Sequence, residues 1–427
     1  MKKKNGLILD VDEKPSMGKW IVLSLQHVFA MFGATILVPI LVNNAAGEEV
    51  LSIPVTLVAS GIGTLLYQLC TKSKSPVYLG SSFAFITPMI LAFAKGGKGG
   101  VFTGIMAVGL AYILIALIIK IVGTKWLEKL LPPIIIGPMI MIIGLGLAPT
   151  AISSIGIEAG AKFVWQNVLV ALITFLTTAF VATRAKGFFK VIPFLIGIVV
   201  GYVSSCVLGL VDFTPIKEAS FFSIPAFQFP FVNYDLDFSS IVIMVPIVLV
   251  TISEHIGDHT VLGTIIGKDL IKDPGLARTL LGDGLATFVA GFIGGPSNTT
   301  YGENTSVVGM SKIASIWVLR LAAIFAIILA FLGKFTALAS TIPNPVLGGV
   351  SLLLYGFISV NGLKVLVENQ VDFSKNKNVI VSAAMLVIGL GGATISISSG
   401  DFSLSISGMV LAAIVGIVLN LVLKEDN

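Results

Sequence analysis

Three ionisable side chains lie at the far end of a long apolar run in the middle of the chain. The run begins at Ile241 and leads into SEHIGDHT, which holds Glu254, Asp258 and His259. Glu254 and Asp258 are four residues apart, so on a helix they share one face. An ionised group facing lipid costs roughly 3 kcal/mol at the centre of a bilayer. We therefore predict that this face meets a ligand or exchanges protons.

The histidines have more ordinary interpretations. Asp258 and His259 could instead lie at the cytoplasmic interface, where water solvates them. His255 points to another side of the helix, and we expect it to form hydrogen bonds between helices, as we do for His27 in the first apolar run. The three histidines do not form a metal-ligand set, so we expect no metal and no cofactor.

A polar, Gly/Pro-broken segment follows the carboxyl groups. It runs from Ser297 to Thr300 and continues into Tyr301, Gly302 and Glu303. Non-helical backbone at membrane depth is tolerated only where it lines a cavity or is paired internally. An earlier segment has a matching break at 80–82, so we predict two short extended pieces that pair with each other.

The helices that follow these pieces would aim free N–H groups at the centre of the protein. A ligand with carbonyl oxygens suits those donors, and Glu254 and Glu303 would accept hydrogen bonds from its N–H groups. Phe83 and Tyr301 occupy equivalent places after the two breaks and could stack on a flat ligand, with ordinary packing as the alternative.

The composition shows what must position these residues. The chain has 427 residues, of which 56% are hydrophobic and only 11% charged. Soluble domains carry about a quarter charged residues, so we predict an all-α polytopic membrane protein. Its net charge of +5 comes from lysines in short connections, which excludes a nucleic-acid signal. Fourteen apolar segments are expected at 20–42, 50–70, 76–95, 100–122, 127–148, 163–183, 191–211, 239–258, 276–294, 299–312, 315–338, 344–361, 378–396 and 403–424.

The two halves of the chain echo each other. Pro-x-x-x-Gly occurs at Pro133 and at Pro345, Gly-x-Gly at Gly61 and at Gly282, and a proline opens the third and the tenth segment. These echoes predict a duplicated seven-segment unit. An odd number of spans per unit inverts the second copy, so the broken segments of the two copies would meet near the midplane.

The lysines and arginines predict the orientation. They concentrate in the N-terminal tail and after even-numbered segments, which places both termini in the cytoplasm. The markers are Lys2, Lys3, Lys4, Lys14, Lys19, Lys72, Lys74, Lys125, Arg184, Lys186, Lys190, Lys268, Lys272, Arg278, Lys375 and Lys377, against Glu48, Glu49, Glu158, Asp235, Asp237 and Asp401 on the other side. Cys70 and Cys206 are expected to stay unpaired. Arg320, inside an apolar segment, is expected to snorkel or to pair with an acid.

Several of these stretches carry a family likeness. EHIGDHTVLG, NTTYGENTSVVGMSK, SLQHVFAMFGATILVP, YLGSSFAFITPM and GGVSLLLYG resemble the nucleobase–ascorbate transporter family over nearly the whole chain. The family motif is Gln/Glu/Pro-Asn-x-Gly, four variable residues, Thr, then a basic residue or Gly. It falls on 303–312, where Ser306 replaces the usual Gly and Ser311 the usual Thr.

The resemblance implies a fourteen-span fold with a 7+7 inverted repeat, whose third and tenth segments contain short antiparallel strands. It also implies a core domain at 1–125 and 213–340 and a gate domain at 126–212 and 341–427. Family substrate contacts fall on Phe83, Glu254, Tyr301, Gly302, Glu303 and Tyr355. The family's proton-coupling position falls on Asp258, with Glu254 and His259 as further candidates.

The function that the resemblance implies is uracil import by proton symport through alternating access, in the bacterial inner membrane. The family's purine carriers usually have Gln at 303 and its uracil carriers Glu, and a carboxylate can only accept hydrogen bonds. We expect uracil, protons and membrane lipid as partners, a homodimer as a possible assembly, and no nucleic acid.

Other functions remain open from the sequence. Within transport, the alternative substrates are xanthine, urate and other nucleobases. An anion exchanger of the same general fold is disfavoured by the acidic centre, which would repel anions. An intramembrane enzyme lacks support, because we find neither a metal set nor a Ser–Lys dyad.

Overall fold

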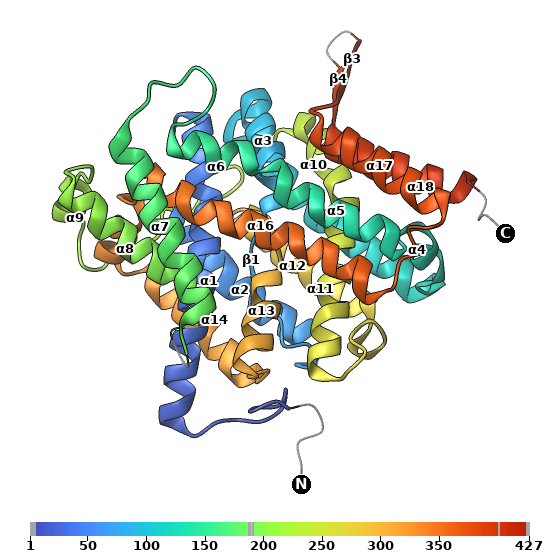
Figure 1. Cartoon of the computed structure of the whole chain (residues 1–427), viewed down its shortest axis with the longest axis horizontal. Coiled ribbons are helices and arrows are strands. Elements are labelled where there is room, and N and C mark those ends of the chain that lie inside the picture. The colour runs from blue at the N-terminus through green and yellow to red at the C-terminus, as the bar shows by residue number, and fades with distance from the viewer. Residues whose placement is uncertain (1–5, 187–188, 190–191, 400–401, 424–427) are drawn as a thin grey trace.

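The computed structural model describes residues 6–186, 189, 192–399 and 402–423, and the side chains of these residues except 396–405. The orientation markers Lys2, Lys3, Lys4, Lys190 and Asp401 therefore lie outside the described residues. The fold is mostly helical (Figure 1). The helices of the first half are α1 (Met17–Ala46), α2 (Ile53–Cys70), α3 (Ile86–Val122), α4 (Lys125–Leu130), α5 (Pro133–Gly146), α6 (Ala148–Ile155), α7 (Trp165–Arg184) and α8 (Pro193–Val207).

The second half begins with a short helix and three helical turns that lead into the central helix. Its helices are α9 (Thr214–Glu218), α10 (Ile241–Met244), α11 (Val248–Ile266), α12 (Leu276–Phe292), α13 (Gly302–Ser311), α14 (Ile316–Ala330), α15 (Gly333–Ser340), α16 (Asn344–Glu368), α17 (Asn376–Leu390) and α18 (Gly408–Val422). The strands are β1 (Leu79–Ser81), β2 (Asn298–Thr300), β3 (Thr394–Ser399) and β4 (Phe402–Ser407).

The two predicted extended pieces pair with each other, as the sequence indicated. β1 and β2 form an antiparallel two-stranded sheet in which Leu79 lies opposite Thr300 and Ser81 opposite Asn298. Neighbouring helices hold the strand ends: the Ser60 hydroxyl of α2 donates to the Leu79 carbonyl at 2.6 Å, and the Thr287 hydroxyl of α12 donates to the Asn298 carbonyl at 2.9 Å. The backbone groups of a buried two-stranded sheet are thus met inside the protein.

Helix α3 begins after β1 and a 3-10 turn at Phe83–Phe85, and it is not continuous. Gly96 and Gly97 have non-helical backbone angles, with φ of +56° at Gly97. A glycine tolerates that angle because it has no Cβ. The break lies between the expected segments 76–95 and 100–122.

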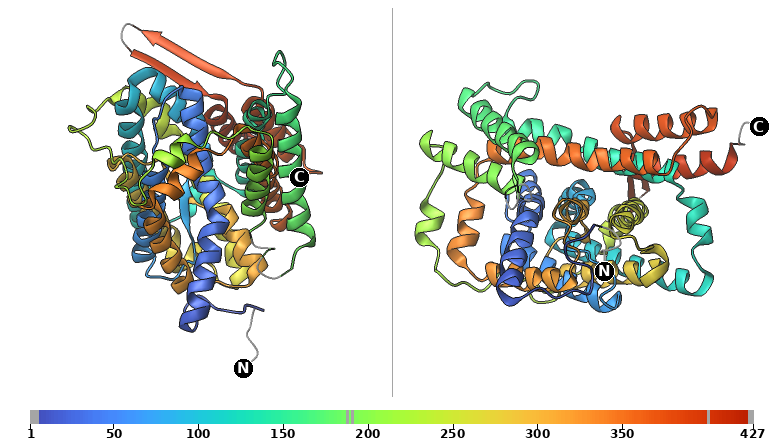
Figure 2. Two further views of the ribbon diagram at one scale, coloured as in Figure 1. Left: turned by 90° about the vertical axis from the view of Figure 1, so that its left-hand side faces the viewer. Right: turned by 60° about the horizontal axis from the view of Figure 1, so that its bottom comes forward.

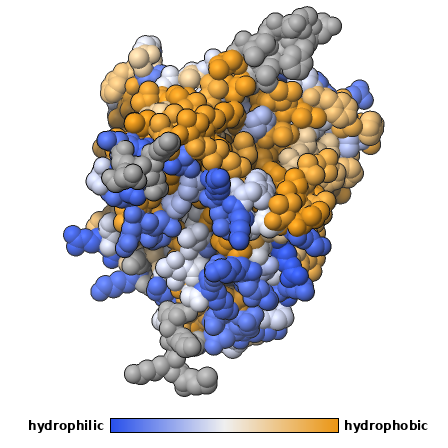
Figure 3. Space-filling model, turned by 90° about the vertical axis from the view of Figure 1, so that its right-hand side faces the viewer, coloured by the Kyte–Doolittle hydropathy of each residue, from blue (hydrophilic) through white to orange (hydrophobic). Residues whose placement is uncertain are grey.

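Seven helical stretches of the described residues are long and apolar enough to cross a membrane. Four more apolar helices, α8, α14, α17 and α18, have 15 residues each. Apolar residues also cover much of the surface. In Figure 3 they occupy the upper part of the drawn face, while polar residues gather below, toward the end with the N-terminal segment. A count of fourteen spans stays a prediction.

The helices pack as two groups. The first, which we call the strand-bearing group, contains α1–α3, α10–α15 and the β1–β2 sheet; its strongest packing is α12 on α3 and α2, and α14 on α2 and α1. The second, the outer group, contains α5–α8 and α16–α18, with α16 packed on α5, α6 and α7 and α17 on α18. The right-hand view of Figure 2 shows the outer group as a layer along one side of the strand-bearing group.

The end of the chain differs from the prediction. The expected segments 378–396 and 403–424 are interrupted by a hairpin of β3 and β4, in which Ile395 lies opposite Ile406. Figure 1 shows this hairpin standing away from the helices. The sequence alternates Ile and Ser through 394–399, which matches the two-residue period of a strand, and the apolar residues led us to extend the helices across it.

Candidate functional site

A cavity of about 440 Å³ lies between the two helix groups. Helices α1, α11 and α13 form one wall, and α5, α7, α8 and α16 form the other. Four polar residues face it amid mostly apolar neighbours: Asp258 of α11, Glu303 of α13, and Asn361 and Lys364 of α16. A concave, largely apolar site with a few convergent polar groups is the usual form of a small-molecule site.

Helix α11 carries the paired carboxyl groups in its interior. The predicted apolar segment ended at 258, but the helix continues to Ile266. Asp258 is 8% exposed and His259 is fully buried, which contradicts a water-solvated position at the membrane interface. The carboxyl groups of Glu254, Asp258 and Glu303 lie close enough to repel one another when ionised.

The N-terminus of α13 supplies the second part of the site. Strand β2 ends at Thr300, Tyr301 precedes the helix, and Gly302 and Glu303 form its first turn. The Tyr301 hydroxyl lies 3.2 Å from Thr35 Oγ1 and 3.3 Å from Ser81 Oγ. A Cβ on Gly80 would collide with the Tyr301 ring, so glycine is required there for the ring to occupy its place.

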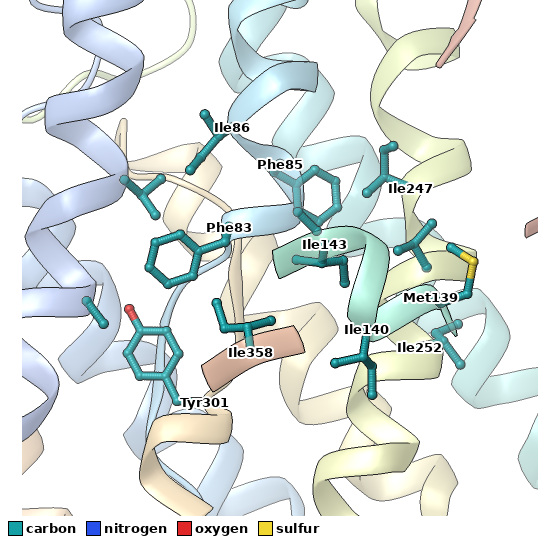
Figure 4. Packing of buried hydrophobic residues seen from close by; sticks show 14 of the residues in the cluster. Phe83, Phe85, Ile86, Met139, Ile140, Ile143, Ile247, Ile252, Tyr301 and Ile358 are labelled. Carbon is teal, nitrogen blue, oxygen red and sulfur yellow. The ribbon is translucent and has the colours of Figure 1, made fainter. Parts of the chain in front are cut away.

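Aromatic rings enclose the site from both helix groups. Phe83 follows β1 in a 3-10 turn, and its ring lies 5.9 Å from that of Tyr355 on α16 in a T-shaped arrangement. Figure 4 shows Phe83 and Tyr301 side by side, with Ile358 of α16 and Ile140 of α5 nearby. Both aromatic residues are almost fully buried, so the equivalent residues of the two breaks do meet in space.

Four polar oxygens in this region have no hydrogen-bond partner among the described residues. They are Glu254 Oε2, Asp258 Oδ2, Glu303 Oε1 and the Tyr355 hydroxyl, all buried. Buried polar atoms in native proteins are nearly always hydrogen-bonded, and an unsatisfied one calls for an explanation. All four belong to residues that the sequence nominated for the site.

Gly302 marks the place where the two helix groups come closest at the site. A Cβ on this residue would lie 3.1 Å from Asp258 Oδ1 and 3.1 Å from Asn361 Nδ2. Asn361 was not predicted. It was recognisable only as a polar residue within the apolar run after Tyr355, and the sequence could not show that it points to the cavity.

The three histidines form hydrogen bonds between elements of the strand-bearing group. His27 Nε2 lies 2.8 Å from Asn304 Oδ1, and His255 Nδ1 lies 2.7 Å from Asp283 Oδ2. Both observations confirm the predicted interhelical role. His259 Nε2 lies 2.6 Å from the Tyr67 hydroxyl of α2, so the structure turns this ring away from the cavity.

The remaining candidates are settled by their surroundings. Arg320 pairs with no acid, contrary to expectation: its Nε donates to Gln68 at 3.2 Å, a terminal nitrogen donates to Ser73, and the guanidinium lies over the Trp317 ring. Cys70 and Cys206 are free thiols, as predicted. Among the described residues, no group of three or more His, Cys, Asp or Glu side chains is arranged to hold a metal ion.

Comparison with known proteins identifies relatives along the whole chain. Residues 18–397 match the model of a permease family. The chain is 47% identical over 421 residues to the uracil permease of Bacillus caldolyticus, covering 98% of this chain and 95% of the relative. It is 46% identical to the uracil permease of Bacillus subtilis (strain 168), covering 99% and 96%, and 41% identical to that of Escherichia coli (strain K12), covering 97% and 94%.

Solved structures show the same fold at much lower identity. The transmembrane domain of a cyanobacterium bicarbonate transporter, BicA, matches with a TM-score of 0.61 at 16% identity, covering 96% of this chain and 99% of that chain. The murine Slc26a9 anion transporter in the inward-facing state matches with a TM-score of 0.66 at 12% identity, covering 96% and 69%. At such identities the likeness concerns the fold alone.

Proposed function

Because the chain belongs to the permease family, we propose that this multi-pass membrane protein imports uracil into the cell by proton symport. The observation that carries the proposal is the convergence of unpartnered buried oxygens from Glu254, Glu303 and Tyr355 beside the Phe83 and Tyr301 rings. The near-full-length identity to uracil permeases supports the choice of substrate.

The chemistry of uracil suits this arrangement. Its ring presents two N–H donors and two carbonyl acceptors on a flat aromatic frame. Glu254 and Glu303 accept from the N–H groups, and the first backbone N–H groups of α13, at Gly302 and Glu303, donate to a carbonyl. Phe83 and Tyr301 hold the ring faces, and Tyr355 closes the site from the outer group.

The fold proposal is a fourteen-span, 7+7 inverted repeat that moves by alternating access. The core domain comprises 1–125 and 213–340, and the gate domain 126–212 and 341–427. The antiparallel pairing of β1 with β2 and the division into strand-bearing and outer groups support it. The cavity between the groups is where a rocking motion of one against the other would open and close a path.

Asp258 is the proposed proton carrier. It shares the cavity with Glu303, lies one helical turn from Glu254, and has one oxygen without a partner. Two desolvated carboxyl groups one turn apart resist being ionised together, so they share protons as a coupled pair. Uracil is best accepted by an ionised Glu254, which leaves the proton on Asp258 in the loaded state. His259 is the reserve candidate, less suited because it faces Tyr67.

The orientation proposal places both termini in the cytoplasm of a bacterial plasma membrane. The N-terminal segment lies at the same end of the molecule as the basic connections, because Asp10 lies 3.7 Å from Lys268 and the Leu9 backbone bridges to Ile313. The exposed apolar faces of the outer group suit lipid or a second copy of the chain; Val207 of α8 is 82% exposed and Val387 of α17 is 72% exposed.

Equilibrium binding to the purified protein tests the substrate assignment. Titration calorimetry should show heat for uracil, and none for xanthine, urate or bicarbonate at the same concentrations. Binding of xanthine or urate in preference to uracil would move the protein to another nucleobase. Binding of bicarbonate alone would favour an anion carrier with the fold of the solved relatives.

A further inference from the structure

A second buried acid–base pair lies behind the cavity, in the strand-bearing group. His255 of α11 and Asp283 of α12 are both fully buried, and their Nδ1 and Oδ2 atoms are 2.7 Å apart. Asp283 lies inside an apolar helix, between Gly282 and Gly284, and its other oxygen has no partner among the described residues. Ionisable groups at membrane depth are functional candidates by default.

The hydrogen bonds around His255 specify where protons reside. The Thr279 hydroxyl donates to the Leu276 carbonyl at 3.1 Å, and it lies 2.8 Å from His255 Nε2. A hydroxyl that donates its only proton to a carbonyl must accept from the ring, so Nε2 carries a hydrogen. The contact between Nδ1 and Oδ2 then needs a further proton, because two bare lone pairs would repel at that distance. In this arrangement the pair holds one proton more than a neutral histidine beside a carboxylate.

The same atoms can accommodate loss of that proton. If the Thr279 hydroxyl rotates to donate to Nε2, the ring keeps a single hydrogen on Nδ1, which is donated to an ionised Asp283. The pair then carries a net charge of −1 instead of zero. The two states differ by one proton and one hydroxyl rotation, without movement of a helix.

The charge of the pair reaches the cavity. Asp283 interacts electrostatically with both Glu254 and Asp258. The ionisable groups that act on Asp283 or feel its charge are Glu254, Asp258 and His259 of α11, Tyr67 and Cys70 of α2, and Tyr112 of α3. This set contains no lysine or arginine, so a negative charge at Asp283 is met by protonation elsewhere in the cluster.

We propose that His255 and Asp283 form a second proton-binding site, which rests on the proposed proton-coupled transport of uracil. When the pair holds its extra proton, Glu254 can ionise and accept a uracil N–H group. When the pair loses that proton, its negative charge forces a proton onto Glu254 and weakens uracil binding. The proton moves between solvent and the pair, and no other bond is made or broken.

A purely structural role makes a different prediction. If the pair only ties α11 to α12, an amide at position 283 keeps the tie, because it can still hydrogen-bond to His255. If the pair binds a proton, Asp283→Asn removes both the exchangeable proton and the negative charge. The variant therefore separates the two roles without removing the contact.

The test measures uracil binding to the purified full-length protein across pH, by calorimetry in buffers of different ionisation enthalpy. Wild-type affinity should fall about tenfold per pH unit once the pair loses its proton. Asp283→Asn should keep its affinity to higher pH and take up one proton fewer on binding at alkaline pH. Tyr67→Phe, which removes a hydroxyl next to His259 in the same buried cluster, should retain the wild-type pH profile.

A wild-type pH profile and proton count in Asp283→Asn would overturn the proposal and leave a structural tie. If that variant does not fold, His255→Gln serves as the second variant with the same expectation. Infrared difference spectra give a readout that needs no uracil: wild type should show carboxyl or imidazole bands that titrate with pH and are missing in Asp283→Asn. Their absence would contradict the inference, whereas wild type that fails to bind uracil contradicts the proposed function alone.

Discussion

The strand-bearing group and the outer group bury different kinds of polar side chain. In the described part of the chain, every buried histidine and acidic residue belongs to the strand-bearing group, on α1, α11 and α12. The buried polar residues of the outer group carry only hydroxyls: Thr174, Thr178, Ser205, Ser351, Ser359 and Ser382, with the phenol of Tyr355. Groups that can hold charge or protons are thus concentrated on one side of the cavity.

The hydroxyl groups also bond differently in the two groups. In the strand-bearing group they cross between elements: Ser24 of α1 donates to the Val318 carbonyl of α14, and Thr287 of α12 to the Asn298 carbonyl of β2. In the outer group, Thr178 and Ser205 donate to carbonyls one turn back in their own helices. The difference suggests a cross-tied unit that carries the chemistry and an outer layer that can shift against it.

The largest expected effect comes from Glu254. Glu254→Gln should abolish detectable uracil binding, because an amide can present an N–H where a uracil N–H needs an acceptor, and the desolvated mismatch is costly. Equilibrium binding to the purified variant is the measurement. Glu368→Gln, at the exposed end of α16, is the matched control and should bind normally. Normal binding by Glu254→Gln would remove this residue from the site.

Asp258→Asn should separate binding from coupling. The amide imitates a protonated carboxyl, so the variant should bind uracil and exchange it across the membrane, yet fail to accumulate it. Counterflow and accumulation assays in proteoliposomes distinguish the two. Asp372→Asn is the control: hydrogen bonds from Ser374 lower the pKa of this exposed carboxyl, which is therefore ionised at neutral pH but far from the cavity. Accumulation by Asp258→Asn would direct the search to Glu254 or His259.

Glu303→Gln should weaken uracil binding about 10- to 100-fold, the range for losing one hydrogen bond to a charged acceptor. The effect is smaller than at Glu254, because the first N–H groups of α13 remain in place. Calorimetry with uracil and with xanthine measures it, and any gain should be for the purine. An unchanged uracil affinity would mean that Glu303 does not touch the ligand.

The smallest effect compares hydroxyls across the two groups. Thr287→Val should lower the free energy of unfolding by about 1–3 kcal/mol, because it leaves the buried Asn298 carbonyl without that donor. Thr178→Val should change it by less than about 1 kcal/mol, since its bond lies within one helix. Denaturation of both variants in detergent provides the comparison. Equal losses would contradict the idea that only the strand-bearing group is cross-tied by hydroxyls.

The sequence was sufficient for features that local chemistry decides. Polar residues at 80–82 and 297–300 in apolar surroundings predicted the paired strands, and the i, i+4 spacing placed Glu254 and Asp258 on one face. Asp283 was overlooked although an acid in an apolar run is a signal, because its glycine neighbours were taken only as a repeat. Asn361 and the β3–β4 hairpin depend on which distant segments meet, which no local pattern specifies.

The account depends most on protons and uracil crossing together through the cavity beside Asp258. Proteoliposomes of wild-type protein, with an imposed pH gradient and no sodium, test this directly when internal pH and radiolabelled uracil are followed together. The account predicts that uracil enters with protons, accumulates above its external concentration, and re-equilibrates when a protonophore is added. Uracil that only equilibrates, or that accumulates on a sodium gradient alone, would contradict it.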